Sequence, residues 1–147
     1  KIGAILGGAP EKDAQLLYDF GIKMGLAFQL QDDYLDVYGD PAVFGKKIGG
    51  DILCNKKTFM LITALSLAEG EDKETLLNWL RATDYVAEEK IQSVTALYNK
   101  VGVPELCQAR IDAYYKEGLE LLDKVNVESS LKEELKKFVC HLMDRKL

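Results

Sequence analysis

Three aspartates spaced as neighbours on a helix, Asp32, Asp33 and Asp36, are the residues best suited to chemistry in this sequence. In a helix, side chains three and four positions apart lie side by side, so the three carboxylates share one face with Gln29. Gly25 lies on the same face and has no side chain to obstruct the approach. Like charges this close repel one another, and a hard cation that prefers oxygen ligands would relieve the repulsion. We therefore expect a Mg²⁺ site here, completed by water and substrate phosphates.

Lysines bracket a glycine-rich segment that follows the aspartates. The first pair is Lys46 and Lys47, the second is Lys56 and Lys57, and Asp51 lies between the pairs. Ammonium groups act as point charges suited to phosphate oxygens, and glycines let the backbone approach a ligand closely. A lone acidic cluster is usually a solvated helix face, and a lysine-bearing loop can be a mere connector. Because acids, glycines and lysines follow one another here, we favour a phosphate-binding loop over residues 39–55.

Helical periodicity determines where these residues lie. The aspartates should end a long helix over about 10–37, because Pro41 disfavours helical backbone in the residue before it. Apolar stripes predict the end of a helix at 1–8 and further helices over 56–67, 72–82, 85–100, 105–124 and 131–145. Asp84 is expected to cap the helix over 85–100, and Ser129 or Ser130 the last one. No segment shows sustained strand alternation, so the pattern predicts an all-α domain of about six or seven helices.

Composition excludes several classes of protein. The chain has 147 residues with a net charge of −5 and a pI of about 5.0, which argues against a nucleic-acid partner. No apolar run approaches the ~20 residues of a membrane span, and no signal peptide is evident, so a cytoplasmic location is expected. The three cysteines show no C-x-x-C spacing and are expected to be reduced thiols. The single histidine, His141, has apolar neighbours and is a poor candidate for a general base.

A calcium-binding loop is excluded by the spacing of the acids. Such a loop needs a glutamate at its twelfth position. Counting from Asp32, Asp33 or Asp36 leads to Val43, Phe44 or Lys47 instead.

Three consecutive motifs resemble the trans-prenyltransferase family, which comprises the polyprenyl, farnesyl and geranylgeranyl diphosphate synthases. The second aspartate-rich region of that family reads F-Q-x-x-D-D-x-x-D, then G-K-x-x-G-x-D, then N-K. The corresponding segments here are Phe28–Asp36, Gly45–Asp51 and Asn55-Lys56. The resemblance extends over essentially the whole chain and implies the helical isoprenoid synthase fold.

The resemblance implies that residues 1–147 form the C-terminal portion of a polyprenyl synthetase domain. A first aspartate-rich region would lie in an N-terminal half, and no second DDxxD occurs in this sequence. The implied reaction condenses an allylic diphosphate with isopentenyl diphosphate, with Mg²⁺ as the cofactor. The complete enzyme would be a homodimer, and this chain alone is expected to be inactive.

The resemblance also implies roles for individual residues. Asp32, and less directly Asp33 and Asp36, would hold Mg²⁺, while Gln29, Lys46 and Lys56 would serve the diphosphate. Asp51 would support these groups without binding the metal or the diphosphate itself. Lys47 and Lys57 each adjoin a motif lysine and could replace it, and Arg145 and Lys146 resemble a basic C-terminus more loosely.

Two other classes of protein share part of this pattern. A class I terpene cyclase has the same fold and a DDxxD motif, but the G-K-x-x-G-x-D and N-K segments favour a prenyltransferase. A helical scaffold or regulatory subunit of a prenyl synthase would keep the acidic face without catalysis.

Overall fold

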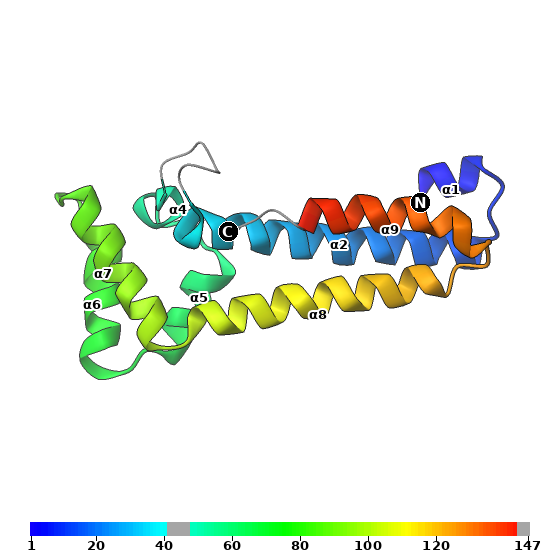
Figure 1. Ribbon diagram of the computed structural model, residues 1–147. Coiled ribbons are helices and arrows are strands. Elements are labelled where there is room, and N and C mark those ends of the chain that lie inside the picture. The colour runs from blue at the N-terminus through cyan, green and yellow to red at the C-terminus, as the bar shows by residue number, and fades with distance from the viewer. Residues whose placement is uncertain (41–47, 144–147) are drawn as a thin grey trace. The chain divides into compact units, whose positions relative to one another are not determined.

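Helices and the turns that join them make up all of the described chain in the computed structural model, which covers residues 1–40 and 48–143 (Figure 1). The helices are α1 (Ile2–Leu6), α2 (Glu11–Tyr38), α4 (Gly50–Leu53), α5 (Phe59–Leu67), α6 (Gly70–Arg81), α7 (Ala87–Lys100), α8 (Val103–Asp123) and α9 (Ser129–Met143). The expected all-α fold is therefore confirmed. Within the same residues, none of the helices is both long enough and apolar enough to cross a bilayer.

The helix boundaries differ from expectation at several points. The short helix α4 interrupts the expected loop over 39–55. Helix α5 begins only after Thr58, whose hydroxyl accepts a hydrogen bond from the amide of Leu61 and so caps the helix. The expected Asp84 cap of α7 is wrong, because Val86 precedes the first turn without a side-chain cap. Helix α9 begins at Ser129, so neither serine stands ahead of it as a cap.

The chain divides into two compact units, and the first combines its two ends. This unit contains Lys1–Gln29 and the described residues from Arg110 onward. Its core consists of Phe20 and Met24 from α2, Leu122 from the end of α8, Val125 from the turn after α8, and Val139 from α9. Gly118 on α8 leaves room for the Met24 side chain, since a β-carbon there would overlap the Met24 methyl group.

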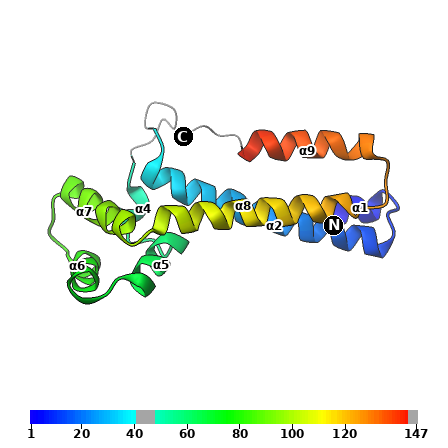
Figure 2. The same ribbon diagram turned by 60° about the horizontal axis from the view of Figure 1, so that its bottom comes forward.

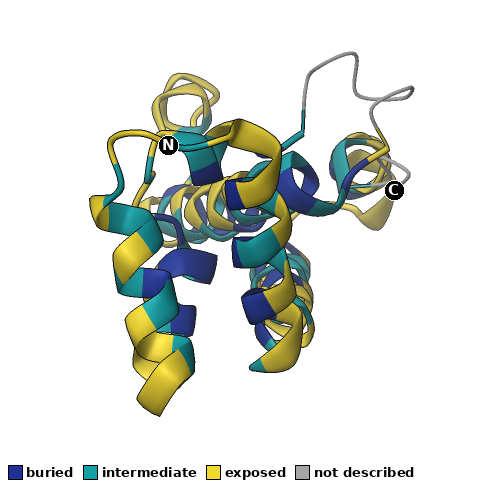
Figure 3. Cartoon of the chain, turned by 90° about the vertical axis from the view of Figure 1, so that its left-hand side faces the viewer, coloured by how far each residue is buried: buried dark blue, intermediate teal, exposed yellow. Residues whose placement is uncertain are grey.

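The second unit, Leu30–Ala109, contains the end of α2 and helices α4 to α7. Helix α7 is central to it and packs against α4, α5 and α6 (Figure 2). Buried and exposed positions alternate along these helices, as expected for amphipathic elements (Figure 3). The aspartates, Asp51 and Lys56 all belong to this unit, so it contains the central part of the expected site.

Candidate functional site

Asp36 connects the last turns of α2 to the next segment of the chain that the structure describes. Its main-chain oxygen accepts a hydrogen bond from the amide of Gly49 at 2.6 Å, and its carboxylate accepts one from the amide of Asp51 at 2.8 Å. The first amides of a helix have no partner within the helix, so this carboxylate caps α4. The predicted metal ligand Asp36 therefore also has a structural role that the spacing did not indicate.

Gly49 makes this connection possible because its backbone is left-handed. Its φ is 86°, which side chains rarely tolerate, and a β-carbon would lie 2.6 Å from the Cδ1 atom of Ile91. The glycine in the G-K-x-x-G-x-D segment is thus required by conformation and by the close approach of α7.

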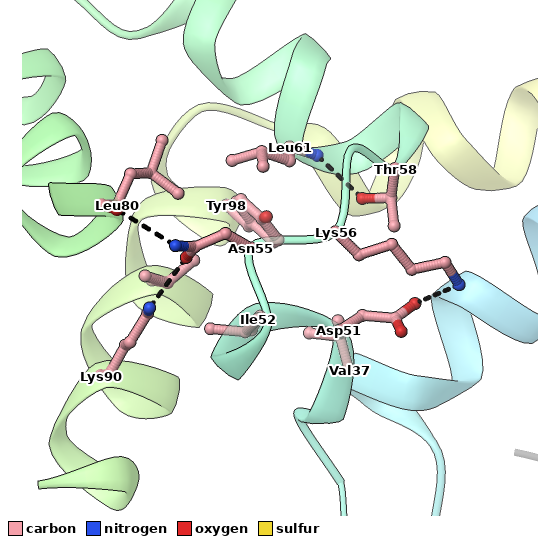
Figure 4. Close-up of a pocket in the computed structure, with 11 residues that line it drawn as sticks. Val37, Asp51, Ile52, Asn55, Lys56, Thr58, Leu61, Leu80, Lys90 and Tyr98 are labelled. Carbon is pink, nitrogen blue, oxygen red and sulfur yellow. Dashed lines mark hydrogen bonds and ion pairs between the residues drawn. The ribbon is translucent and has the colours of Figure 1, made fainter. Parts of the chain in front are cut away.

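Lys56 lies between two carboxylates and is the centre of the site. Its Nζ atom donates to Asp33 Oδ1 and to Asp51 Oδ2, each at 2.8 Å, and the second contact is drawn in Figure 4. The two aspartates are largely covered, with side chains 18% and 19% exposed, whereas that of Lys56 is 51% exposed. The lysine therefore reaches from solvent to acids that come from α2 and α4.

The carboxylates at this site are partly desolvated. Burial raises the pKa of Asp33 above its usual value, although the hydrogen bond from Lys56 opposes this. Burial likewise raises the pKa of Asp36, against the hydrogen bond from the Asp51 amide. The hydrogen bonds to Asp33 and then to Asp51 raise the pKa of Lys56. Desolvation outweighs the ion pair at Asp33 because one ammonium is shared by two carboxylates that repel each other.

The donor set at this site suits a hard divalent cation that brings further ligands of its own. Carboxylate oxygens are the donors that Mg²⁺ prefers, and it usually takes only one or two of them together with water and phosphate. Within the described residues, no three Asp, Glu, His or Cys side chains are arranged to hold a metal ion by themselves. Asp32, Asp33 and Asp36 remain suitable ligands for a metal that arrives with diphosphate.

A second lysine, Lys90 on α7, is buried behind Lys56 and was not among the expected site residues. Its Nζ atom donates to Asn55 Oδ1 at 2.8 Å and lies 3.5 Å from the main-chain oxygen of Leu53. Asn55 in turn donates to the main-chain oxygen of Leu80 at 3.1 Å, and these contacts surround a small cavity (Figure 4). The only sign of this connection in the sequence is that Asn55 directly precedes Lys56.

The other predicted site residues are less closely defined. Gln29 and Lys57 are exposed. Lys46, Lys47, Arg145 and Lys146 lie outside the described residues. The structure thus brings together Asp33, Asp51 and Lys56, with Asp36 holding the Asp51 segment in place.

The first unit contains a separate apolar pocket of about 310 Å³ between α2 and α9. Its lining is almost entirely hydrocarbon and consists of Phe20, Met24, Gly25, Phe28, Leu135, Phe138, Val139, Leu142 and Met143. Gly25 has open space where a side chain would project. A pocket of this size and lining suits an apolar ligand.

The helical fold and the order of the acids, glycines and lysines fit the class of isoprenoid synthases. The model of the polyprenyl synthetase family matches residues 1–99, and the chain belongs to that family. The resemblance drawn from the three motifs is thereby confirmed.

Curated relatives include a short chain isoprenyl diphosphate synthase of Methanothermobacter thermautotrophicus, 36% identical over 134 residues. That match covers 89% of this chain and 40% of the relative. A geranylgeranyl diphosphate synthase of Sulfolobus acidocaldarius is 29% identical, with 99% of this chain and 43% of the relative covered. The chain therefore spans about two fifths of the length of these relatives, and none of them favours a terpene cyclase or a scaffold.

Solved structures agree with the family assignment. A crystal structure of geranylgeranyl pyrophosphate synthase matches with a TM-score of 0.86 and 35% identity, covering 99% of this chain and 45% of that one. The synthase from Corynebacterium glutamicum, solved in complex with isoprenyl diphosphate and magnesium, matches with a TM-score of 0.85 and 30% identity. This second match covers 98% of this chain and 41% of the other.

Proposed function

We propose that this chain supplies the Mg²⁺- and diphosphate-binding part of a prenyl diphosphate synthase that joins an allylic diphosphate to isopentenyl diphosphate. The observation that carries the proposal is Lys56, held between Asp33 and Asp51 at the end of α2. Family membership supports the reaction, and the related synthase complexed with isoprenyl diphosphate and magnesium supports the ligands.

The chemistry of the reaction explains why such a site is needed. When the allylic diphosphate ionises, negative charge develops on the departing diphosphate, and fixed positive groups lower the barrier by receiving it. Lys56 would donate to diphosphate oxygens in place of one of its carboxylates, and Lys46 would do so from the neighbouring motif. Bound Mg²⁺ would supply Lewis-acid charge compensation on the same oxygens.

The remaining residue roles follow the same proposal. Asp32, and less directly Asp33 and Asp36, would hold the metal, and Gln29 would orient the substrate or stabilise the developing cation. Asp51 would keep Lys56 in place, and Lys47 and Lys57 could replace the lysines beside them. Arg145 and Lys146, which match the family more loosely, would add positive charge for the diphosphate. The apolar pocket between α2 and α9 would accept a prenyl chain, because its lining is hydrocarbon.

We further propose that residues 1–147 correspond to the part of the family's domain that bears the second aspartate-rich motif. The complete enzyme would be a homodimer acting in the cytoplasm. The homodimer follows from the family resemblance, and both features concern the enzyme as a whole.

The test is calorimetric titration of inorganic pyrophosphate into the chain with and without Mg²⁺. We expect clearly tighter binding of pyrophosphate when Mg²⁺ is present, because pyrophosphate supplies oxygen ligands to the metal and the metal supplies positive charge to pyrophosphate. Replacing Asp32→Asn together with Asp33→Asn keeps the size of the side chains and removes their charge. This pair should abolish the effect of Mg²⁺, because the amide oxygens carry no charge that attracts the cation.

A matched control is Glu74→Gln, which neutralises an exposed acid on α6. It should leave the titration unchanged. The proposal would be contradicted if the Asp32→Asn, Asp33→Asn variant bound pyrophosphate and Mg²⁺ as the unmodified chain does.

A further inference from the structure

Lys90 is only 1% exposed, an unusual state for a lysine. Its ammonium group contacts Asn55 Oδ1, the main-chain oxygen of Leu53 and the face of the Tyr85 ring, whose centre is 4.4 Å away. Within the part of the chain that the structure describes, it forms no ion pair with a carboxylate. Every one of these partners is neutral.

Burying an ammonium group among neutral partners costs free energy, and only well-placed acceptors offset it. A methionine or leucine at this position would avoid the cost. Two contacts of Lys90, those with Leu53 and Asn55, lie at the end of α4. The main-chain oxygen of Leu53 also accepts a hydrogen bond from the Tyr85 hydroxyl at 3.2 Å. The buried charge therefore acts on the turn that follows α4.

That turn leads directly to Lys56. Asn55 has a left-handed backbone with φ of 53°, a conformation that asparagine tolerates better than most residues. The Lys56 amide donates to the main-chain oxygen of Asp51 at 2.9 Å, and the Lys56 oxygen accepts from the Thr58 amide at 2.8 Å. Fixing the side chain of Asn55 therefore sets the direction in which Lys56 leaves the turn.

The surroundings of Lys90 leave no room for a substrate. The cavity bordered by Lys90, Asn55 and Tyr98 measures about 10 Å³, enough for a single water molecule at most. Figure 4 shows the Lys90 side chain pointing at Asn55 from one side while Lys56 extends the other way toward Asp51. The two lysines thus act on opposite sides of the same turn.

We propose that Lys90 is a positioning residue that acts through Asn55 to hold Lys56 against Asp33 and Asp51. The inference rests on the proposed role of Lys56 as a diphosphate ligand. Lys90 does not touch the diphosphate itself. Its buried charge locks the turn so that the ammonium of Lys56 is in place before the ligand arrives.

The test compares Lys90→Met, Asn55→Gly and the double variant. Glycine keeps the left-handed backbone but removes the acceptor for Lys90. In each variant, pyrophosphate in the presence of Mg²⁺ should bind roughly tenfold more weakly, as when one charge-assisted hydrogen bond is removed. The double variant should be no weaker than either single one, because both break the same link.

A second measurement does not depend on any ligand. Lys56 should react more readily with a small acylating reagent in Lys90→Met and Asn55→Gly than in the unmodified chain, as read by peptide mass spectrometry. Release from its two carboxylates is the reason. If pyrophosphate does not bind even to the unmodified chain, the proposed function fails, while this reactivity still tests the link between the lysines.

The control is Lys132→Met. Lys132 is also buried, at 9% exposure, and donates to the main-chain oxygens of Asp123 and Val125 in the other unit. Its replacement should lower stability without changing Lys56 reactivity or pyrophosphate affinity. Unchanged reactivity and affinity in a folded Asn55→Gly chain would overturn the proposal, as would additive losses in the double variant.

Discussion

Lys56 offsets one of the negative charges that the aspartates of the site carry. Asp33 and Asp51 share its ammonium, and burial still raises the pKa of Asp33. A divalent cation that joins this site therefore competes with a lysine already present. Release of that lysine toward diphosphate oxygens would couple the binding of the two ligands, which is the cooperativity that the pyrophosphate titration measures.

The thiol of Cys107 should make the stability of the chain depend on pH. Burial raises the pKa of its thiol from 9.0 to about 12, and the side chain is fully buried. Because the pKa is higher in the folded chain than in the unfolded one, the bound proton stabilises the folded state at pH values below the unfolded pKa. This stabilisation is lost as the pH rises toward 12. The free energy of unfolding should thus fall above pH 9, by at most about 1.4 kcal/mol per pH unit for one proton.

The measurement is urea unfolding at several pH values between 8 and about 9.5, where most unfolded tyrosines are still protonated because their pKa is about 10. Cys107→Ala should reduce the slope in this range. Cys140→Ala, which replaces an exposed cysteine, should retain it. A slope that is unchanged in Cys107→Ala would assign it to other groups, such as the buried tyrosines, whose pKa values burial also raises.

Spacing along the chain predicted the aspartates and Lys56 as site residues but did not point to Lys90. The first set follows from helical geometry and from local motifs, both of which the sequence contains in full. Lys90 follows Glu88 and Glu89, so its local pattern is that of a solvated helix face. Its burial arises only because α7 packs against α4, α5 and α6, and no local pattern encodes that contact.

Helix α4 depends on contacts from outside its own four residues. Four residues cannot form a stable helix alone, because nucleation costs more than so few hydrogen bonds return. The carboxylate of Asp36 and the left-handed Gly49 supply what the segment itself lacks. A glycine-rich stretch was therefore expected as a loop, whereas the structure contains a short helix held from outside.

Gly49→Ala tests this arrangement. The left-handed conformation alone should cost about 1–2 kcal/mol for alanine, and the contact with Ile91 adds to this. The free energy of unfolding from urea denaturation should fall by about 2 kcal/mol or more.

The matched control is Gly21→Ala in the interior of α2, where nothing lies within 4 Å of the added β-carbon. That change should stabilise the helix by roughly 0.5–1 kcal/mol. Equal effects of the two substitutions would show that the backbone at Gly49 is not restrained.

Several apolar side chains of α1 and α2 are exposed. These are Ile2, Ile5, Leu6, Tyr18, Ile22 and Leu26. Apolar surface of this kind commonly marks a site where another protein surface binds. The chain also carries a single aspartate-rich cluster, whereas charge on the leaving diphosphate must be compensated from more than one side.

We therefore expect no product when the chain is incubated with dimethylallyl diphosphate, isopentenyl diphosphate and Mg²⁺. Each missing preorganised hydrogen-bond donor or metal ligand costs about 10²–10³ in rate, and at least two would be absent. Chromatography of the prenyl products is the measurement, with the complete Methanothermobacter thermautotrophicus relative as the positive control. Sustained elongation by this chain would mean that one aspartate-rich cluster is sufficient.

The two buried lysines have a consequence for proteolysis. Trypsin cleaves after lysine only where the side chain can enter the protease and the backbone can unwind, and Lys90 and Lys132 are buried within helices α7 and α9. Cleavage at either site must therefore await opening of the surrounding structure. Because the two residues belong to different units, their cutting rates report the opening of each unit separately within one intact chain.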